Sequence, residues 1–235
     1  MPFDDRRQLL CWRWRLRGKK TTMPALSEFL QTSAVHHKHL CPRQVLGVRM
    51  GMRAAVELGL DLPQSNKRLY TFVETDGCLV DGVSAATGCT VGRRTLQVRD
   101  FGKVAATFVD TETGAAIRIF PHPDARQTAL LYAPGERDRW HAQLAGYQIM
   151  PDEALLVVQP VELSVSMAAI ISRPGVRTVC EQCGEEIINE REIVCGGITL
   201  CRACAGDSYY RVCERPAITA QGVSRASESG DPRRA

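Results

Sequence analysis

The sequence predicts an α+β protein with two parts: a core domain with a mixed or antiparallel sheet and helices, and a small C-terminal treble-clef zinc finger. Two observations support this fold class. Helical and strand-like patterns alternate irregularly between residues 24 and 163, without the regular repeat of a βαβ fold. Beyond residue 178 the sequence becomes rich in cysteine and contains two Cys-x-x-Cys pairs. The chain of 235 residues is long enough for one domain of ordinary size and a small appendage.

Composition divides the chain into four segments. Residues 1–22 carry seven basic and two acidic side chains and lack hydrophobic periodicity. They are predicted to form a disordered basic extension, and the alternative is that Met23 is the first residue of the protein. The core domain is expected over residues 23–172 and the zinc finger over residues 178–213. Residues 217–235 are small and polar, which predicts a disordered tail.

The first elements of the core are expected to be helices. The stretch "PALSEFLQT" at residues 24–32 is amphipathic. From Pro42 onward, apolar residues recur at the spacing of one helical face. Pro42 is a residue type that begins helices, and Gly59 is a type that ends them. The sequence therefore predicts a helix from Pro42 to about Gly59.

The rest of the core mixes strands with shorter helices. Strands are predicted at residues 68–74, 95–100, 103–110 and 115–120, and "TETG" makes the last two a hairpin. A short helix is expected over residues 81–87, capped by Asp81. In "RLYTFVE", Leu69, Thr71 and Val73 are expected on one side of the strand. A helix near residues 135–146 and a strand within 154–163 complete the domain.

Charge and hydropathy narrow the classes of function and partner. The net charge of +4 arises from residues 1–22, which sum to +5, so the remainder sums to −1 and nucleic-acid binding is not expected. No apolar run approaches the roughly 18 residues of a membrane span. Arginines interrupt the apolar patch "LLCWRWRLR", so a secretory signal is not expected either. These features predict a cytoplasmic protein whose ten cysteines are mostly reduced.

The C-terminal cysteines have the spacing of a metal site. Cys180 and Cys183 form one pair, and Cys201 and Cys204 form the other. Four thiolates complete a tetrahedron, which suits zinc, and they leave no open position for chemistry. Disulfides and an iron–sulfur cluster are the alternatives. A knuckle, a hairpin around Gly196 and Gly197, and a helix opened by the second pair would give a treble clef.

A second group of potential ligands lies in "VHHKHLCP". Because Pro42 disfavours the α conformation at Cys41, the preceding residues are expected to be extended, with His37, His39 and Cys41 on one side. Cys41 is expected at the helix N-cap, where a thiolate is favoured. We interpret His37, His39 and Cys41, with Cys78 as a fourth member, as a site for a second divalent metal or a ligand. The alternative is a surface loop that is rich in histidine.

Several motifs together resemble one family. "HHKHLCPRQVLGVRMG", "ETDGCLVDGVSAATGCTVGRRTLQVRDFGKVAATF" and "TGAAIRI" are similar to the FmdE family, which takes its name from formylmethanofuran dehydrogenase. The match includes Asp81, Cys89 and Lys103 besides the candidate ligands. The chain departs from the family pattern at Lys38 and Arg43, where glycine is usual. The resemblance implies an α+β core with a finger, often as a homodimer.

The resemblance also sets the expected function. It implies a metal-binding accessory protein linked to molybdenum or tungsten oxidoreductases, with oxidoreductase subunits as partners. If the protein is a subunit of a formylmethanofuran dehydrogenase-type enzyme, it is not the catalytic one, because nothing in the sequence would build the molybdenum or tungsten centre. Two alternatives stay open: an enzyme that uses Cys41 as a nucleophile or metal ligand, and a regulatory module that acts through its zinc finger.

Overall fold

The computed structural model describes residues 21–36, 39–171 and 173–212, except for the side chain of His36. The chain divides into two compact units, one ending at Ile171 and the other beginning at Ser172. The predicted extension and tail lie almost entirely outside the described residues. Thr22, which was assigned to the extension, is described: its N–H donates to Asp61 at 2.7 Å, and its carbonyl accepts from the Leu62 N–H at 3.0 Å.

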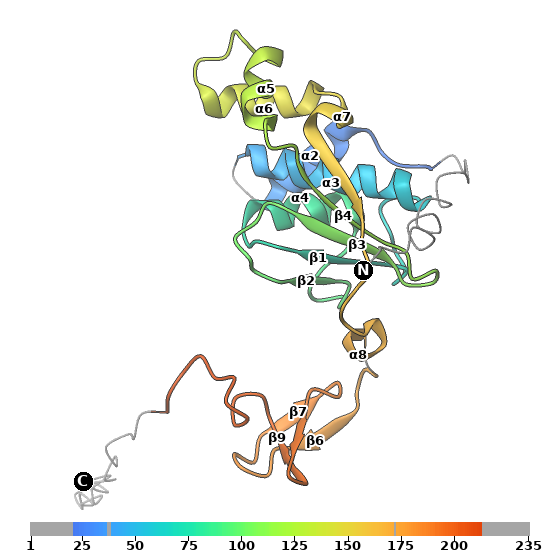
Figure 1. Cartoon of the computed structure of the whole chain (residues 1–235), viewed down its shortest axis with the longest axis vertical. Coiled ribbons are helices and arrows are strands. Elements are labelled where there is room, and N and C mark those ends of the chain that lie inside the picture. Colours follow the sequence, from blue (N-terminus) through green and yellow to red (C-terminus); the bar gives the residue numbers. More distant parts are fainter. Residues whose placement is uncertain (1–20, 37–38, 172, 213–235) are drawn as a thin grey trace, which may run out of the picture. The chain divides into compact units, whose positions relative to one another are not determined.

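A five-stranded mixed sheet forms the centre of the first unit (Figure 1). Its order is β2-β1-β3-β4-β5, where β1 pairs with β2 in parallel and the other neighbours are antiparallel. The strands are β1 (Leu69–Val73), β2 (Leu96–Val98), β3 (Ala106–Asp110), β4 (Ala116–Pro121) and β5 (Leu156–Pro160). The α+β class and the β3–β4 hairpin are therefore confirmed.

Three helices provide most of the core against one face of this sheet. They are α2 (Leu26–His36), α3 (Pro42–Leu58) and α4 (Cys78–Thr87). Apolar side chains of α3 and α4, such as Val45 and Val83, are buried in one cluster with Leu69, Val73 and Phe108 of the sheet. As predicted, α3 begins at Pro42 and ends at Gly59, which adopts the left-handed conformation.

The opposite face of the sheet is also covered. Tyr70 and Phe72 of β1 form a second buried cluster with the chain segment 161–170. This segment ends within the short helix α8 (Met167–Ile171). Every residue of β1 is therefore buried, although alternation of its side chains had suggested only that Leu69, Thr71 and Val73 share one side.

Three more helices lie between β4 and β5 in sequence: α5 (Ala125–Tyr132), α6 (Arg139–Ile149) and α7 (Asp152–Leu155). The sequence predicted only α6. The Arg49 side chain of α3 fixes the end of α6, because its Nη1 donates to the Tyr147 carbonyl and its Nη2 to the Met150 carbonyl, both at 2.7 Å. No helix among the described residues is long and apolar enough to cross a membrane.

The second unit contains two hairpins. One pairs β6 (Arg177–Val179) with β7 (Glu186–Ile188), and the other pairs β8 (Ile193–Cys195) with β9 (Ile198–Leu200). The helix expected after Cys201 is not formed within residues 201–212. A single turn closes from the Ala205 N–H to the Cys201 carbonyl at 2.9 Å. Gly206 then has a φ of 101°, a value that a right-handed helix does not allow.

Candidate functional site

The close contact between α3 and α4 positions the core site. A Cβ atom on Gly82 of α4 would lie 2.2 Å from the carbonyl oxygen of Gln44 in α3. A Cβ atom on Gly47 of α3 would lie 2.5 Å from the Leu79 carbonyl oxygen of α4. Further along the two helices, Gly51 of α3 contacts Ala86 of α4. The helices therefore run in the same direction with their backbones touching, and their N-termini lie side by side.

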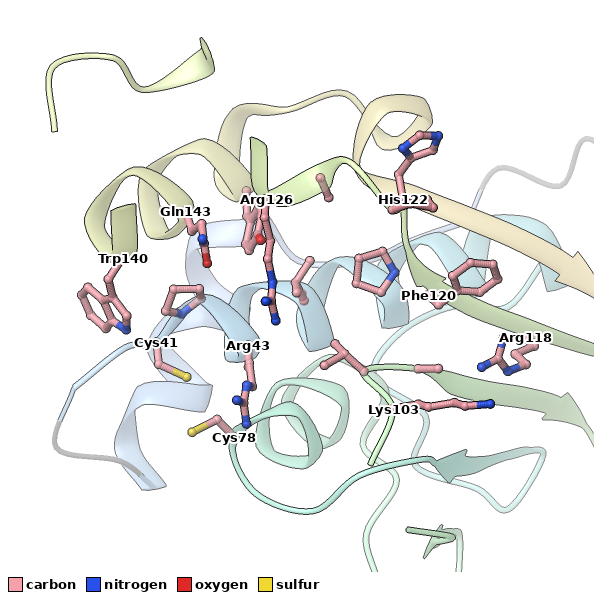
Figure 2. A pocket seen from close by; sticks show the side chains of 18 residues that line it. Cys41, Arg43, Cys78, Lys103, Arg118, Phe120, His122, Arg126, Trp140 and Gln143 are labelled. Carbon is pink, nitrogen blue, oxygen red and sulfur yellow. The ribbon is translucent and has the colours of Figure 1, made fainter. Parts of the chain in front are cut away.

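This packing brings two thiols together. Cys41 is the N-cap of α3, and Cys78 is the first residue of α4. The two side chains lie near one another (Figure 2), and Cys78 is close enough to influence the acidity of Cys41. Cys41 is 8% exposed, whereas Cys78 is half-buried. The structure thus brings Cys78 close to Cys41, and the site predicted from them and the histidines stays a prediction.

The surroundings of Cys41 fix its position. Its backbone is extended, as expected before a proline, and its N–H donates to Oε1 of Gln44 at 2.8 Å. The Gln44 amide nitrogen in turn donates to the carbonyl and hydroxyl oxygens of Ser33, both at 3.0 Å. Gln44 is fully buried, so this bridge ties the cysteine loop to α2.

The surroundings of Cys41 in the metal-free chain do not favour the thiolate that the sequence led us to expect. Burial raises the pKa of the Cys41 thiol above its ordinary value, and the neighbouring Cys78 adds to the increase. The backbone N–H groups of Gln44 and Arg43 act in the opposite direction but do not overcome burial. Desolvation disfavours the charged form of a thiol, and here it outweighs the helix terminus.

The other predicted members of the site have different positions. His37 lies outside the described residues. His39 lies in a bend and is exposed, and α2 extends to His36, so the stretch before Cys41 is not uniformly extended. Within the described part of the chain, His39 does not complete a group of three metal-ligating atoms with the two thiols.

Two further residues of this region are structural. Cys89 is 1% exposed, and its thiol donates to the Leu69 carbonyl at 3.2 Å. Asp81 lies in the first turn of α4 and is not its cap, because the helix begins earlier and Gly77 is the N-cap. Cys78 therefore belongs to the helix itself and does not precede it.

The two thiols lie at one end of an open cavity of about 780 Å³ (Figure 2). The walls come from the first turn of α3, the loop before β3, the end of β4, and the helices α5 and α6. Besides the cysteines, the side chains that give the cavity its character are cationic or aromatic: Arg43, Lys103, Arg118, Phe120, His122, Arg126, Trp140 and Tyr147.

Sequence reasoning missed most of this lining. Lys103 matched the family pattern and Arg118 lies within the motif "TGAAIRI", but Arg126 and Trp140 had no recognisable motif around them. They are far from Cys41 in sequence and reach the cavity only because β4, α5 and α6 fold over α3. No pattern in one sequence could have grouped them.

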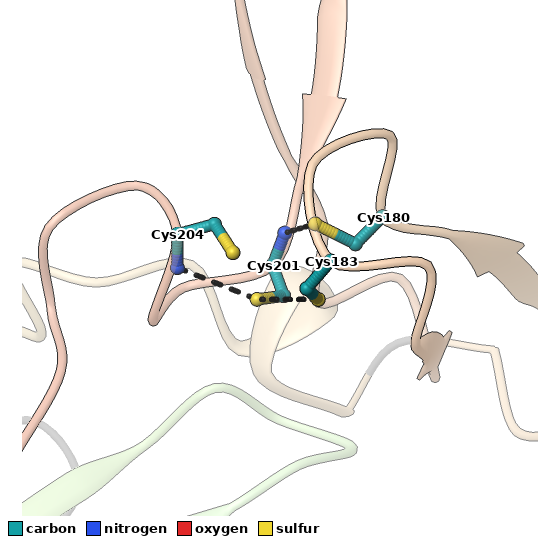
Figure 3. A group of neighbouring side chains, drawn as sticks. All are labelled: Cys180, Cys183, Cys201 and Cys204. Atoms are coloured by element: carbon teal, nitrogen blue, oxygen red, sulfur yellow. Dashed lines mark hydrogen bonds between the residues drawn. The ribbon is translucent and has the colours of Figure 1, made fainter. Parts of the chain in front are cut away.

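The C-terminal cysteines converge as predicted (Figure 3). The four sulfurs of Cys180, Cys183, Cys201 and Cys204 lie within 4.8 Å of one another and could hold a metal ion. Backbone N–H groups point at two of them: that of Cys201 donates to the Cys180 sulfur at 3.2 Å, and that of Cys204 to the Cys201 sulfur at 3.4 Å. Gly184 has a φ of 75°, which gives the first pair its tight turn.

The metal-free thiols of this group differ in acidity. Hydrogen bonds from the backbone N–H groups of Cys183 and Cys201 lower the pKa of Cys180 to about 6. The hydrogen bond to Cys201 raises the pKa of Cys204 to about 12. One thiolate thus forms readily and makes the next harder to form, which is typical of ligands packed closely enough to share one cation.

Sequence comparison identifies the family. A family model described as "FmdE, Molybdenum formylmethanofuran dehydrogenase operon" matches residues 36–157. The chain belongs to the FmdE family. The match begins at His36 and includes Cys41, Cys78 and all the residues that line the cavity. The resemblance drawn from the sequence motifs is thereby confirmed.

Two similar proteins extend the comparison. A protein of Archaeoglobus fulgidus named "Probable S-adenosyl-L-methionine-binding protein" is 30% identical over 85% of this chain, which spans 58% of that relative's length. The crystal structure of a protein from Syntrophus aciditrophicus, described as "tungsten formylmethanofuran dehydrogenase subunit e (fmde)-like", has a TM-score of 0.51 at 24% identity. It covers 80% of this chain and 96% of its own, and this likeness supports the fold alone.

Proposed function

We propose that the protein is a metal-binding accessory protein of molybdenum or tungsten oxidoreductase metabolism, with a structural zinc in the second unit and a second divalent metal in the core. One observation carries the core site: two thiols from different helices meet at the end of a cavity. Two soft ligands leave coordination positions open for a preceding histidine, His37 or His39, and for a ligand in the cavity.

The geometry of the second unit fits zinc. In a tetrahedral site with Zn–S bonds of about 2.3 Å, neighbouring sulfurs are about 3.8 Å apart. The sulfurs of Cys183 and Cys201 are 3.9 Å apart. Four protein ligands fill the coordination sphere, so this metal would stabilise a unit whose hairpins are only three residues long on each side.

A thiol-dependent enzyme is less well supported. A nucleophilic cysteine requires a lowered pKa, whereas burial raises that of Cys41. A metal would instead displace the proton from the buried sulfur and remove this difficulty. The structure therefore favours metal binding over nucleophilic catalysis at Cys41.

The name of the Archaeoglobus relative suggests S-adenosyl-L-methionine as a ligand. That molecule has a net positive charge at neutral pH because it combines a sulfonium and an ammonium group with one carboxylate. The cavity is lined by four Arg or Lys side chains, which would repel it. We therefore do not propose this ligand for the cavity.

Metal analysis of the purified full chain tests the proposal. We expect two metal ions per chain, one of them zinc. Cys41→Ser or Cys78→Ser should each release only the core metal, and Cys183→Ser only the zinc. Cys195→Ser is the matched control, because Cys195 is an exposed cysteine outside the group of four.

Two results would contradict parts of this proposal. Unchanged metal content in both core variants would show that Cys41 and Cys78 bind no metal. Zinc retained after Cys183→Ser would show that the four cysteines are not its ligands. Homodimer formation and association with oxidoreductase subunits are proposed from the family, and light scattering and co-purification measure them.

A further inference from the structure

The Arg, Lys, Asp and Glu side chains that line the cavity beside the thiols are all positively charged. Four of its side chains are arginine or lysine, and among the described residues that line it none is Asp or Glu. A charged surface in a folded protein normally interleaves both signs. The same cations gathered around a concave surface create a positive potential that is focused into the cavity.

Only one of the four cations has a carboxylate partner in the described part of the chain. Arg118 makes a bidentate pair with the buried Glu74, at 2.6 Å from its Nε and 2.7 Å from its Nη2. The structure gives no hydrogen bond or ion pair between a protein group and the side chains of Arg43, Lys103 or Arg126 in the described residues. Glu74 thus pairs with Arg118, whereas Arg43, Lys103 and Arg126 have no direct carboxylate partner among the described residues.

The cations are spread over the cavity. Figure 2 shows Arg43 and Arg126 at the end that holds the two thiols, and Lys103 and Arg118 at the other end. A ligand that contacts both ends must therefore have separated negative groups or a body that connects them. A cavity of about 780 Å³ lies within the range that holds drug-sized and cofactor-sized molecules, about 300–1,000 Å³.

Aromatic side chains complete the lining. Trp140 lies at the thiol end and is 41% exposed. Phe120 lies at the other end, where the Arg118 guanidinium lies 4.9 Å from the centre of its ring. An exposed tryptophan beside unpaired arginines provides a flat surface for a ring of a bound molecule.

We infer that the cavity binds a cofactor-sized organic anion that combines a flat ring with two or more phosphate or carboxylate groups. Arg43, Lys103 and Arg126 bind its negative groups, and Trp140 stacks on its ring. The inference goes beyond the proposed function, because this lining would bind an anion whether or not a metal lies on Cys41 and Cys78.

Calorimetric titration of the full chain tests this inference with three probes. ADP combines a ring with phosphates, trimesate combines a benzene ring with three carboxylates, and pyrophosphate has charge but no ring. We expect one of the two ring-bearing probes to bind about tenfold more tightly than pyrophosphate. Which of them binds more tightly distinguishes a phosphorylated ligand from a polycarboxylate.

Matched variants separate the cavity from general surface charge. Lys103→Gln and Arg126→Gln should each weaken binding about tenfold, because each removes a charge-assisted contact. Lys67→Gln and Arg99→Gln are the controls, since both side chains are exposed and lie outside the cavity. Trp140→Ala should remove the preference for the ring-bearing probe, whereas Phe101→Ala, an exposed aromatic outside the cavity, should keep it.

The outcome does not depend on the core metal. The titrations are repeated on chelator-treated protein, and the metal content of each sample is measured, so a failure here is distinguishable from failure of the metal site. The inference is overturned if no probe binds, if the control variants weaken binding as much as the cavity variants do, or if pyrophosphate binds as tightly as both ring-bearing probes.

Discussion

Replacing Gly82 with alanine should separate the two helices that hold the core thiols. The added Cβ would lie 2.2 Å from the Gln44 carbonyl oxygen and 3.0 Å from its Cα. Both are backbone atoms of α3, so no flexible side chain can move away. An ordinary contact begins at 3.4 Å, which requires the helices to move apart by about 1.2 Å.

The expected loss follows from opposing effects. Overpacking of a well-packed contact costs about 1–3 kcal/mol, and a rigid backbone neighbour puts this case at the upper limit. A gap of about 1 Å along the rest of the contact adds to the loss, because it forfeits up to half of the dispersion energy there. In the opposite direction, alanine favours the helical conformation over glycine by about 1 kcal/mol, which offsets part of this loss of stability. We therefore expect the free energy of unfolding to fall by about 2–3 kcal/mol.

Urea denaturation measures this loss, and Gly92→Ala is its control. A Cβ at Gly92 would have no neighbour within 4 Å, so this change should be neutral or slightly stabilising. Metal analysis of folded Gly82→Ala protein should also show loss of the core metal, because Cys41 and Cys78 move apart. If Gly82→Ala unfolds within about 0.5 kcal/mol of the unmodified chain, the tight contact between α3 and α4 is not real.

Three further changes test other parts of the first unit. Glu74→Gln should lower the free energy of unfolding, measured in urea, by about 2 kcal/mol, because it leaves the half-buried Arg118 without its charge partner. An unchanged free energy of unfolding would contradict the stabilising role of this ion pair. For Asp110, burial alone would raise the pKa, but hydrogen bonds from the Arg68 side chain, the Glu112 backbone N–H and the Thr113 side chain hold it below its usual value. The Asp110 charge therefore stabilises the fold above about pH 4, and this stabilisation is lost as the pH falls through the folded-state pKa. Asp110→Asn should therefore make the free energy of unfolding fall less steeply at acid pH. An unchanged dependence of that free energy on pH would refute this. Removing residues 1–22 deletes two hydrogen bonds of Thr22 and should cost about 1–2 kcal/mol by thermal unfolding. No change would instead agree with the expectation from the sequence that the whole segment is a disordered extension.

Proline and glycine residues in the sequence predicted where some helices and hairpins begin, turn and end. Pro42 and Gly59 set the bounds of α3, since proline fixes φ and lacks an N–H whereas glycine tolerates the left-handed conformation. The hairpin at Gly196 and Gly197 formed for a similar local reason. By contrast, α5 was missed, and the helix expected after Cys201 did not form: the chain makes a turn and reaches a positive φ at Gly206.

The sequence by itself determined the family, the mixed α+β class and the convergence of four cysteines on one point, because each rests on residues close together in the chain or on paired spacing. Only the tertiary structure decided the acidity of Cys41, because burial depends on what packs over the thiol. It also decided the cavity, whose cations come from α3, β4, α5 and a loop before β3. Electrostatic potential and desolvation depend on distance in space, and spacing along one sequence does not contain that distance.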